Sequence, residues 1–149
     1  MSDAQAPLPA PLQAIIDDFR DMSREEKLET LLEFSEQLPA LPAPLRASAP
    51  LERVDECATP VDIAFELRDR QIFFHFDIPP ESPTVRGFAE ILRQGLNGLE
   101  PKEIVRLPND IYYRMGLQSA LSPQRLNGVH FMVVHLKLVA ARGLAQLGQ

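Results

Sequence analysis

One cysteine, Cys57, is the residue in this 149-residue chain with the clearest potential for nucleophilic chemistry. It lies in the segment LERVDECATPVD at residues 51–62, which brings three carboxylates close to the thiol in sequence, those of Glu52, Asp55 and Glu56. Three roles are open to such a residue: packing in the core, nucleophilic catalysis, or carrying a group that another protein delivers. Free cysteine is among the most often buried residue types, so packing is the default interpretation.

The surroundings of Cys57 favour a functional role over packing. The cysteine fits no helical or strand pattern, and it ends a polar segment directly before the first long predicted strand, with Thr59-Pro60 close behind it. We therefore expect Cys57 at the tip of a loop, where binding and catalytic groups are commonly presented.

The acidic neighbours argue against an independent cysteine hydrolase. The thiolate is the reactive form of cysteine, and nearby cations or a helix N-terminus lower its pKa. Carboxylates near Cys57 would raise that pKa instead, and no histidine can be assigned as its base from the sequence. A thiol of this kind suits attack on a sulfur atom that a partner enzyme has already activated.

The three histidines predict neither a metal site nor a catalytic base. His130 and His135 are five residues apart, so on a helix they would point about 140° apart, and His75 stands alone in an apolar strand. One cysteine cannot form an internal disulfide, and a structural zinc site usually needs four Cys or His ligands at close spacing. We expect structural or solvated histidines, and no metal or other bound cofactor.

The bulk composition is that of an ordinary globular domain, with 45% apolar and 24% charged residues. The net charge of −6 argues against nucleic acid or an anionic membrane surface as partners, because both attract clustered Lys and Arg. The N-terminal MSDAQAPLPAPLQ lacks the basic and apolar regions of a secretion signal. No stretch approaches the roughly 20 apolar residues of a membrane span. We expect a cytoplasmic protein.

The hydrophobic pattern predicts two helices before Pro39 and a hairpin in the middle of the chain. The first helix carries a helical stripe of Leu12, Ile15, Ile16 and Phe19, and a capping box of Ser23 and Glu26 opens the second. The Pro-rich segment 38–50 is expected to be an extended linker that forms no helix. Residues 61–67 and 71–77 alternate apolar and polar side chains around an RDR turn, which predicts a β-hairpin that can gain a third strand.

Two Ser-Pro pairs mark the starts of long helices in the C-terminal half. Ser82-Pro83 and Ser122-Pro123 each precede an apolar stripe, with two short helices between them, from Pro101 to Pro108 and around IYYRM. This order predicts an α+β fold in which helices pack on one face of a small antiparallel sheet. We expect a single domain over residues 11–142, a mobile Pro-rich tail at 1–10 and a C-terminal tail at 143–149.

Four ordered blocks of sequence resemble the SufE family of sulfur acceptors. They are FRDMSREEKLETLLEFSEQLP at 19–39, ERVDECATPV at 52–61, ESPTVRGFAEILRQGLNG at 81–98 and MGLQSALSPQRLNGVHFM at 115–132. The strongest marks are the cysteine before the hairpin, SPTVRG at 82–87 and LSPQRLNG at 121–128. The resemblance covers roughly residues 12–140, and the SufE/IscU-like fold that it implies agrees with the α+β prediction.

The resemblance implies that Cys57 takes persulfide sulfur from a pyridoxal-phosphate cysteine desulfurase of the SufS type, stimulates that enzyme, and passes the sulfur to a SufB-like iron–sulfur scaffold. The pyridoxal phosphate belongs to the partner, so this chain is an accessory protein rather than a stand-alone enzyme. Two alternatives stay open: a binding module that activates a desulfurase without carrying sulfur, and an independent thiol enzyme. Weak association into a homodimer is also open.

Five further residues are candidates for supporting the cysteine or binding the partner: Glu56, Ala58, Asp77, Arg86 and Arg125. Arg86 and Arg125 each occupy the first turn of a helix, where a cation opposes the helix dipole. Each either holds the cysteine loop or contacts the desulfurase, or else forms a structural salt bridge with Asp77 or Glu81. Glu56 and Ala58 stand where many relatives have Gly and Gln, and Asp62 stands where many have an aromatic residue, so these positions bear on which desulfurase fits.

An exposed persulfide is vulnerable to oxidants and stray thiols. We therefore expect the Cys57 side chain to turn inward in the resting state, against apolar residues of the hairpin or the last helix, and to swing out when the partner docks.

Overall fold

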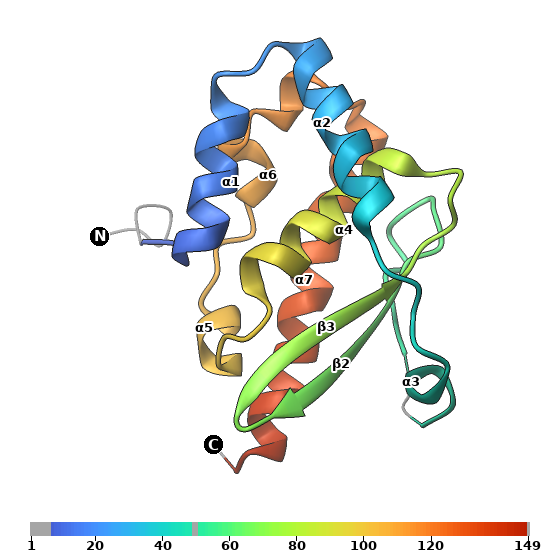
Figure 1. Cartoon of the computed structure of the whole chain (residues 1–149), viewed down its shortest axis with the longest axis vertical. Coiled ribbons are helices and arrows are strands. Elements are labelled where there is room, and N and C mark those ends of the chain that lie inside the picture. Colours follow the sequence, from blue (N-terminus) through green and yellow to red (C-terminus); the bar gives the residue numbers. More distant parts are fainter. Residues whose placement is uncertain (1–6, 49–50, 149) are drawn as a thin grey trace.

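The computed structural model describes residues 7–48 and 51–148 and consists of helices around a three-stranded antiparallel sheet (Figure 1). The predicted α+β class is therefore confirmed. The sheet order is β1-β2-β3, with β1 at Glu52–Arg53, β2 at Asp62–Arg68 and β3 at Gln71–Asp77. The helices are α1 (Ala10–Arg20), α2 (Arg24–Gln37), α3 (Ala43–Ser48), α4 (Pro83–Leu96), α5 (Pro101–Val105), α6 (Ile111–Arg114) and α7 (Pro123–Gln146), and a 3₁₀ turn covers Leu117–Ser119.

The first two helices form as their sequence signals predict. The apolar stripe of α1 buries Leu12, Ile16 and Phe19. The capping box of α2 is complete: the Ser23 hydroxyl accepts from the Glu26 amide at 3.1 Å, and the Glu26 carboxylate accepts from the Ser23 amide at 2.8 Å. These two bonds satisfy backbone donors that a helix start otherwise leaves unpaired. Leu8 is buried, so the predicted tail at 1–10 is already part of the packed structure at that residue; residues 1–6 of that tail lie outside the described residues.

The Pro-rich segment contains a short helix, α3, so the prediction of a helix-free linker was wrong. Proline is tolerated in the first turn of a helix, where its missing N–H would have had no partner. Pro44 occupies such a position, and the Pro42 carbonyl accepts from the amides of Leu45 and Arg46 at 3.1 and 3.3 Å. Residues 49–50 of this segment lie outside the described residues.

The hairpin has the predicted strands, and β1 supplies the third strand by pairing with β2. The two-residue turn Asp69-Arg70 has positive φ at both positions, 50° and 69°. The inward face carries Ile63, Phe65 and Leu67, as predicted. Ala64 on the opposite face is also buried, at 2% exposure, and α3 packs against β2. The outer face of the sheet is therefore not fully solvated as the alternating pattern suggested.

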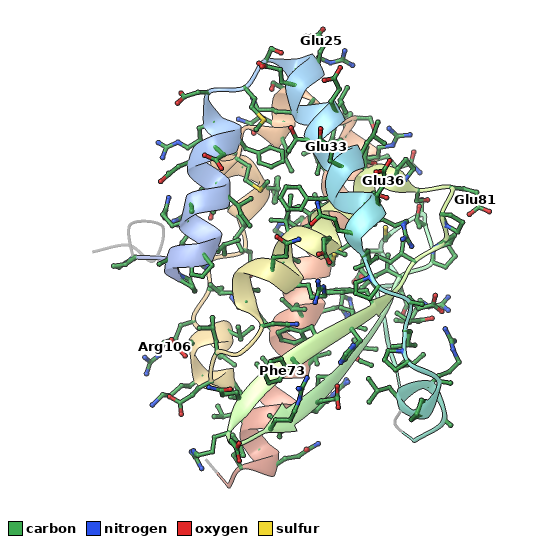
Figure 2. All side chains as sticks on the ribbon, viewed as in Figure 1. Glu25, Glu33, Glu36, Phe73, Glu81 and Arg106 are labelled. Atoms are coloured by element: carbon green, nitrogen blue, oxygen red, sulfur yellow. The ribbon has the colours of Figure 1, made fainter. Side chains whose placement is uncertain are left out.

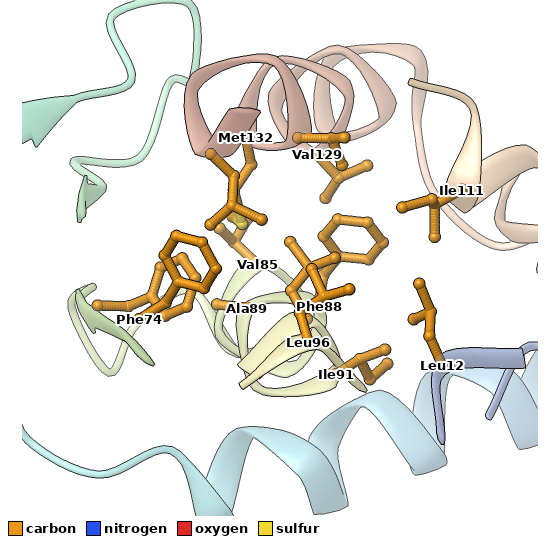
Figure 3. Packing of buried hydrophobic residues seen from close by; sticks show 14 of the residues in the cluster. Leu12, Phe74, Val85, Phe88, Ala89, Ile91, Leu96, Ile111, Val129 and Met132 are labelled. Carbon is orange, nitrogen blue, oxygen red and sulfur yellow. The ribbon is translucent and has the colours of Figure 1, made fainter. Parts of the chain in front are cut away.

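The core lies between α4 and α7 (Figure 3). Val85, Phe88 and Ala89 of α4 face Val129 and Met132 of α7, and all five are buried. Burying one such large apolar side chain contributes about 1.5–3 kcal/mol. The α4 helix also packs against α1 and α2, so it is the central element of the fold.

The α7 helix reaches the length and mean hydropathy, 1.3, of a membrane span. It is nevertheless a packing element here, because it contacts α4, α5, α6 and two strands of the sheet. It continues to Gln146 with Gly143 buried, so the predicted C-terminal tail beginning at residue 143 starts too early.

The outer side of α2, in contrast, carries exposed Glu25, Glu33 and Glu36 (Figure 2).

Candidate functional site

Cys57 lies at the tip of the loop that joins β1 to β2, as the sequence predicted. The loop closes through a hydrogen bond from the Val54 amide to the Val61 carbonyl at 3.0 Å, and both valines are buried. The Cys57 amide donates to the Val54 carbonyl at 3.2 Å, which turns the chain at the cysteine. We call residues 54–61 the cysteine loop.

The thiol of Cys57 points inward onto α7, at Gly128. A Cβ atom added to Gly128 would lie 2.8 Å from Cys57 Sγ, closer than real Cβ atoms approach other heavy atoms. The cysteine is half-buried and packs against the edge of the hydrophobic core. The absence of a side chain at Gly128 thus provides the seat for the sulfur, and the predicted inward orientation toward the last helix is observed.

Burial raises the pKa of the Cys57 thiol, and a hydrogen bond from the Thr59 backbone acts in the opposite direction without cancelling the effect. The direction agrees with the expectation from the sequence, but the cause differs. We expected the nearby carboxylates to raise this pKa, whereas those of Glu52 and Glu56 are bound to His135. Cys57 is therefore a protonated, weakly nucleophilic thiol at neutral pH.

A small open cavity of about 120 Å³ lies beside the thiol. It is lined by Cys57, Ala58, Thr59, Val85, Gln124 and Arg125. A water molecule occupies about 30 Å³ in the liquid, so the cavity has room for one additional sulfur atom on Cys57. Thr59 is fixed at its edge by the Ser82 hydroxyl, 2.7 Å away. Ser82 directly precedes α4, but its side chain makes no capping hydrogen bond to that helix.

The other predicted site residues lie at different distances from this cavity. Ala58 and the exposed Arg125 line it, and the Glu56 carbonyl accepts from Asn127 of α7 at 3.4 Å. Asp77 pairs with Arg46 of α3 instead of with either predicted arginine.

Arg86 forms no salt bridge with Asp77 or Glu81 among the contacts of the described residues. Its guanidinium donates to the carbonyls of Ile78 and Ser35, at 2.8 and 3.3 Å. These bonds tie the segment after β3 to the end of α2, so Arg86 holds the scaffold around the loop rather than the loop itself.

No sequence pattern indicates that His135 belongs to this region. Its two ring nitrogens lie 2.5 Å from Glu52 and 2.8 Å from Glu56, across sequence separations of 83 and 79 residues. No spacing rule connects residues so far apart, and only the packing of α7 on β1 brings them together. Within residues 7–48 and 51–148, no group of three His, Cys, Asp or Glu side chains is arranged to hold a metal ion.

Comparisons with known proteins place this geometry in context. The sequence model described as "SufE: Fe-S metabolism associated domain" matches residues 13–140. A SufE-like protein of Mycobacterium tuberculosis is 42% identical over 135 residues, covering 90% of this chain and 94% of the relative. A SufE-like protein of Synechocystis is 34% identical over 149 residues, covering 98% and 89% of the two chains. The solution structure of a hypothetical protein from Thermus thermophilus superposes with a TM-score of 0.81 at 29% identity, covering 93% of this chain and 99% of that one.

Proposed function

The chain belongs to the SufE family of iron–sulfur metabolism proteins, and we propose that Cys57 carries sulfur taken from a cysteine desulfurase of the SufS type. The observation that carries the proposal is the setting of Cys57. A single thiol lies at a loop tip, half-shielded, beside a cavity that can hold one more sulfur atom.

The transfer is a thiol–persulfide exchange. The Cys57 sulfur attacks the terminal sulfur of the persulfide on the desulfurase, forming a new S–S bond as the old one breaks. The desulfurase cysteine leaves as a thiolate and takes the proton that Cys57 gives up. Cys57 becomes a persulfide, and no external oxidant or reductant is needed.

The environment of Cys57 suits a carrier better than a stand-alone enzyme. A pKa raised by burial keeps the resting thiol protonated, which protects it from oxidation but leaves it a poor nucleophile. Reaction then depends on a partner that presents an activated sulfur and draws the cysteine loop out. Arg125 lines the cavity and offers a positive charge to an anionic persulfide.

The same proposal defines the partners. The desulfurase supplies the pyridoxal phosphate, so this chain needs no resident cofactor, and a SufB-like scaffold receives the sulfur in the cytoplasm. Ala58 and Arg125 at the cavity, together with Glu56, form the surface that enters the desulfurase site. Asp77 and Arg86 support it from the scaffold.

Intact mass spectrometry after incubation with a SufS-type desulfurase and L-cysteine tests the proposal. The wild-type chain should gain about 32 Da per sulfur atom, lose it on reduction, and show no gain as Cys57→Ser. Faster alanine production with both proteins, without any adduct, would instead identify an activator that carries no sulfur. No adduct and no stimulation with either of two desulfurases would contradict both.

A further inference from the structure

His135 on α7 joins two carboxylates that precede Cys57. Its Nδ1 lies 2.5 Å from Glu52 Oε2, and its Nε2 lies 2.8 Å from Glu56 Oε1. A neutral imidazole has one donor and one acceptor nitrogen, whereas ionised carboxylates only accept. Both contacts are therefore hydrogen bonds only when the ring is protonated and carries a positive charge. We call Glu52, Glu56 and His135 the acidic clasp.

The two ends of the clasp differ in strength. Glu52 is 14% exposed, and its other oxygen accepts from Arg142, about two turns further along α7, at 2.6 Å. Glu56 is 39% exposed, and among the described residues its carboxylate pairs with the side chain of His135. The Glu52 carboxylate is thus anchored twice. The Glu56 carboxylate, next to Cys57, is held by His135, and the Glu56 backbone is tied to α7 by the long 3.4 Å hydrogen bond from Asn127.

We propose that His135 is a positioning residue for sulfur transfer: when protonated, it holds the cysteine loop against α7 with the thiol seated at Gly128, and when it is neutral, the Glu56 end is released and Cys57 can leave its seat. The use of this release for sulfur transfer rests on the proposed function. The release itself does not, because it depends only on contacts within this chain.

The charges that face His135 fix the direction of the pH dependence. Burial lowers the pKa of His135, but the hydrogen bonds and charges of Glu52 and Glu56 outweigh burial, so its pKa is raised above the ordinary value of 6.5. In turn, its own backbone amide and His135 lower the pKa of Glu56. For Glu52, burial raises the pKa, but His135 and Arg142 together lower it.

Because the pKa of His135 is raised, its protonation stabilises the closed loop fully at pH values below about 6.5. This stabilisation is lost as the pH rises through the higher pKa that His135 has in the folded state. On the acid side, the clasp weakens as the pH falls through the lowered pKa values of the glutamates. The loop is therefore held most tightly between these limits and opens as the solution becomes alkaline.

Alkylation of Cys57 by iodoacetamide, followed by mass spectrometry on the full chain, tests the clasp. His135→Gln is neutral at every pH, so its amide lacks the positive charge with which protonated His135 binds the two carboxylates. At about pH 6 its Cys57 should react roughly tenfold faster than in the wild type, the effect expected for loss of one hydrogen bond to a charged group. The ratio of the two rates should fall toward one as the pH rises to about 9, where wild-type His135 is also neutral.

The matched control is His75→Gln. His75 forms a histidine–carboxylate pair of the same kind, 2.7 Å from Glu66, on the sheet. This variant should react at the wild-type rate throughout. Glu56→Gln removes the negative charge that His135 binds, so it should also accelerate alkylation at acidic pH. It tests the clasp independently if His135→Gln misfolds, which circular dichroism would detect.

Two outcomes would overturn the proposal: a rate ratio that does not change with pH, or equal acceleration in His75→Gln. The experiment uses no desulfurase, so its result is independent of sulfur loading. A pH-dependent ratio without any sulfur adduct would keep the clasp and reject the carrier. An adduct with a flat ratio would do the reverse.

Discussion

At the scale of single residues, the seat of the Cys57 thiol depends on what Gly128 lacks. Most glycines in helices lower stability, by about 1 kcal/mol relative to alanine. Gly128 stands in the interior of α7, where a Cβ would lie 2.8 Å from Cys57 Sγ. The loss of helix propensity is therefore offset by room for the sulfur, and the two residues should be energetically coupled.

Gly128→Ala should lower the free energy of unfolding by about 1–3 kcal/mol, because an added methyl group overfills a packed contact. It should also make Cys57 react faster with iodoacetamide, because the thiol is displaced outward. In a Cys57→Ala background the clash is absent, so the same substitution should be neutral or stabilising by up to about 1 kcal/mol. Urea denaturation of the four proteins measures this coupling.

Gly143→Ala on the same helix is the control. An added Cβ there meets only side-chain carbons at 3.4 to 3.5 Å, which is ordinary contact, so this substitution should not be destabilising. Equal destabilisation by Gly128→Ala with and without the Cys57 sulfur would show that the seat is not formed by this contact.

At the scale of the elements, local signals predicted most of the scaffold. The capping box of Ser23 and Glu26 and the apolar stripe of α4 depend on neighbours within a few residues, and both form as expected. The helix α3 was missed because proline excludes a helix interior but not its first turn. Asp77 is one of two salt-bridge partners that the sequence offers to Arg86 and Arg125, whereas in the folded chain it pairs with Arg46.

The candidate site likewise has a part that the sequence predicted and a part that it did not. The loop position of Cys57 followed from its place before a strand, and the cavity beside it combines residues from blocks that the sequence had singled out. The acidic clasp could not be predicted, because His135 and Glu56 are 79 residues apart and meet only through tertiary packing. Because the carboxylates of Glu52 and Glu56 are bound to His135, burial rather than the nearby negative charge explains the raised pKa of the Cys57 thiol.

The turn between β2 and β3 provides a prediction at this scale. Asp69 and Arg70 both have positive φ, as in the type I′ turns that match the twist of a two-residue hairpin. Arginine is strained in this conformation, whereas glycine adopts it freely. Arg70→Gly should therefore stabilise the protein by about 0.5–1 kcal/mol, measured as a shift in the urea midpoint.

Gln71→Gly, one residue later and at the first position of β3, should have the opposite effect, since glycine has a low preference for strands. A loss of stability in both variants would mean that the positive φ of Arg70 does not limit the hairpin.

At the scale of the whole molecule, the proposed sulfur transfer requires the cysteine loop to move while the rest of the chain stays folded. The core elements make this separation feasible. Phe88, Ala89 and Ile91 of α4 are fully buried, and α4 packs against α1, α2, α7 and β3. The loop between Val54 and Val61, in contrast, is closed by few backbone hydrogen bonds, and most of its residues between these two valines are exposed or half-buried.

Native-state hydrogen exchange should therefore resolve two classes of amides. Those of Phe88 to Leu92 should exchange only through global unfolding, with a free energy in the range of about 5–15 kcal/mol typical of domains. The amide of Cys57, bonded to the Val54 carbonyl at 3.2 Å, should exchange through local opening at a much lower free energy that does not change with low urea. After correction for intrinsic exchange rates, His135→Gln should lower the protection of Cys57 without affecting α4. If Cys57 exchanged with the same free energy and urea dependence as α4, the loop could not open alone, and sulfur transfer would require the partner to unfold part of the core.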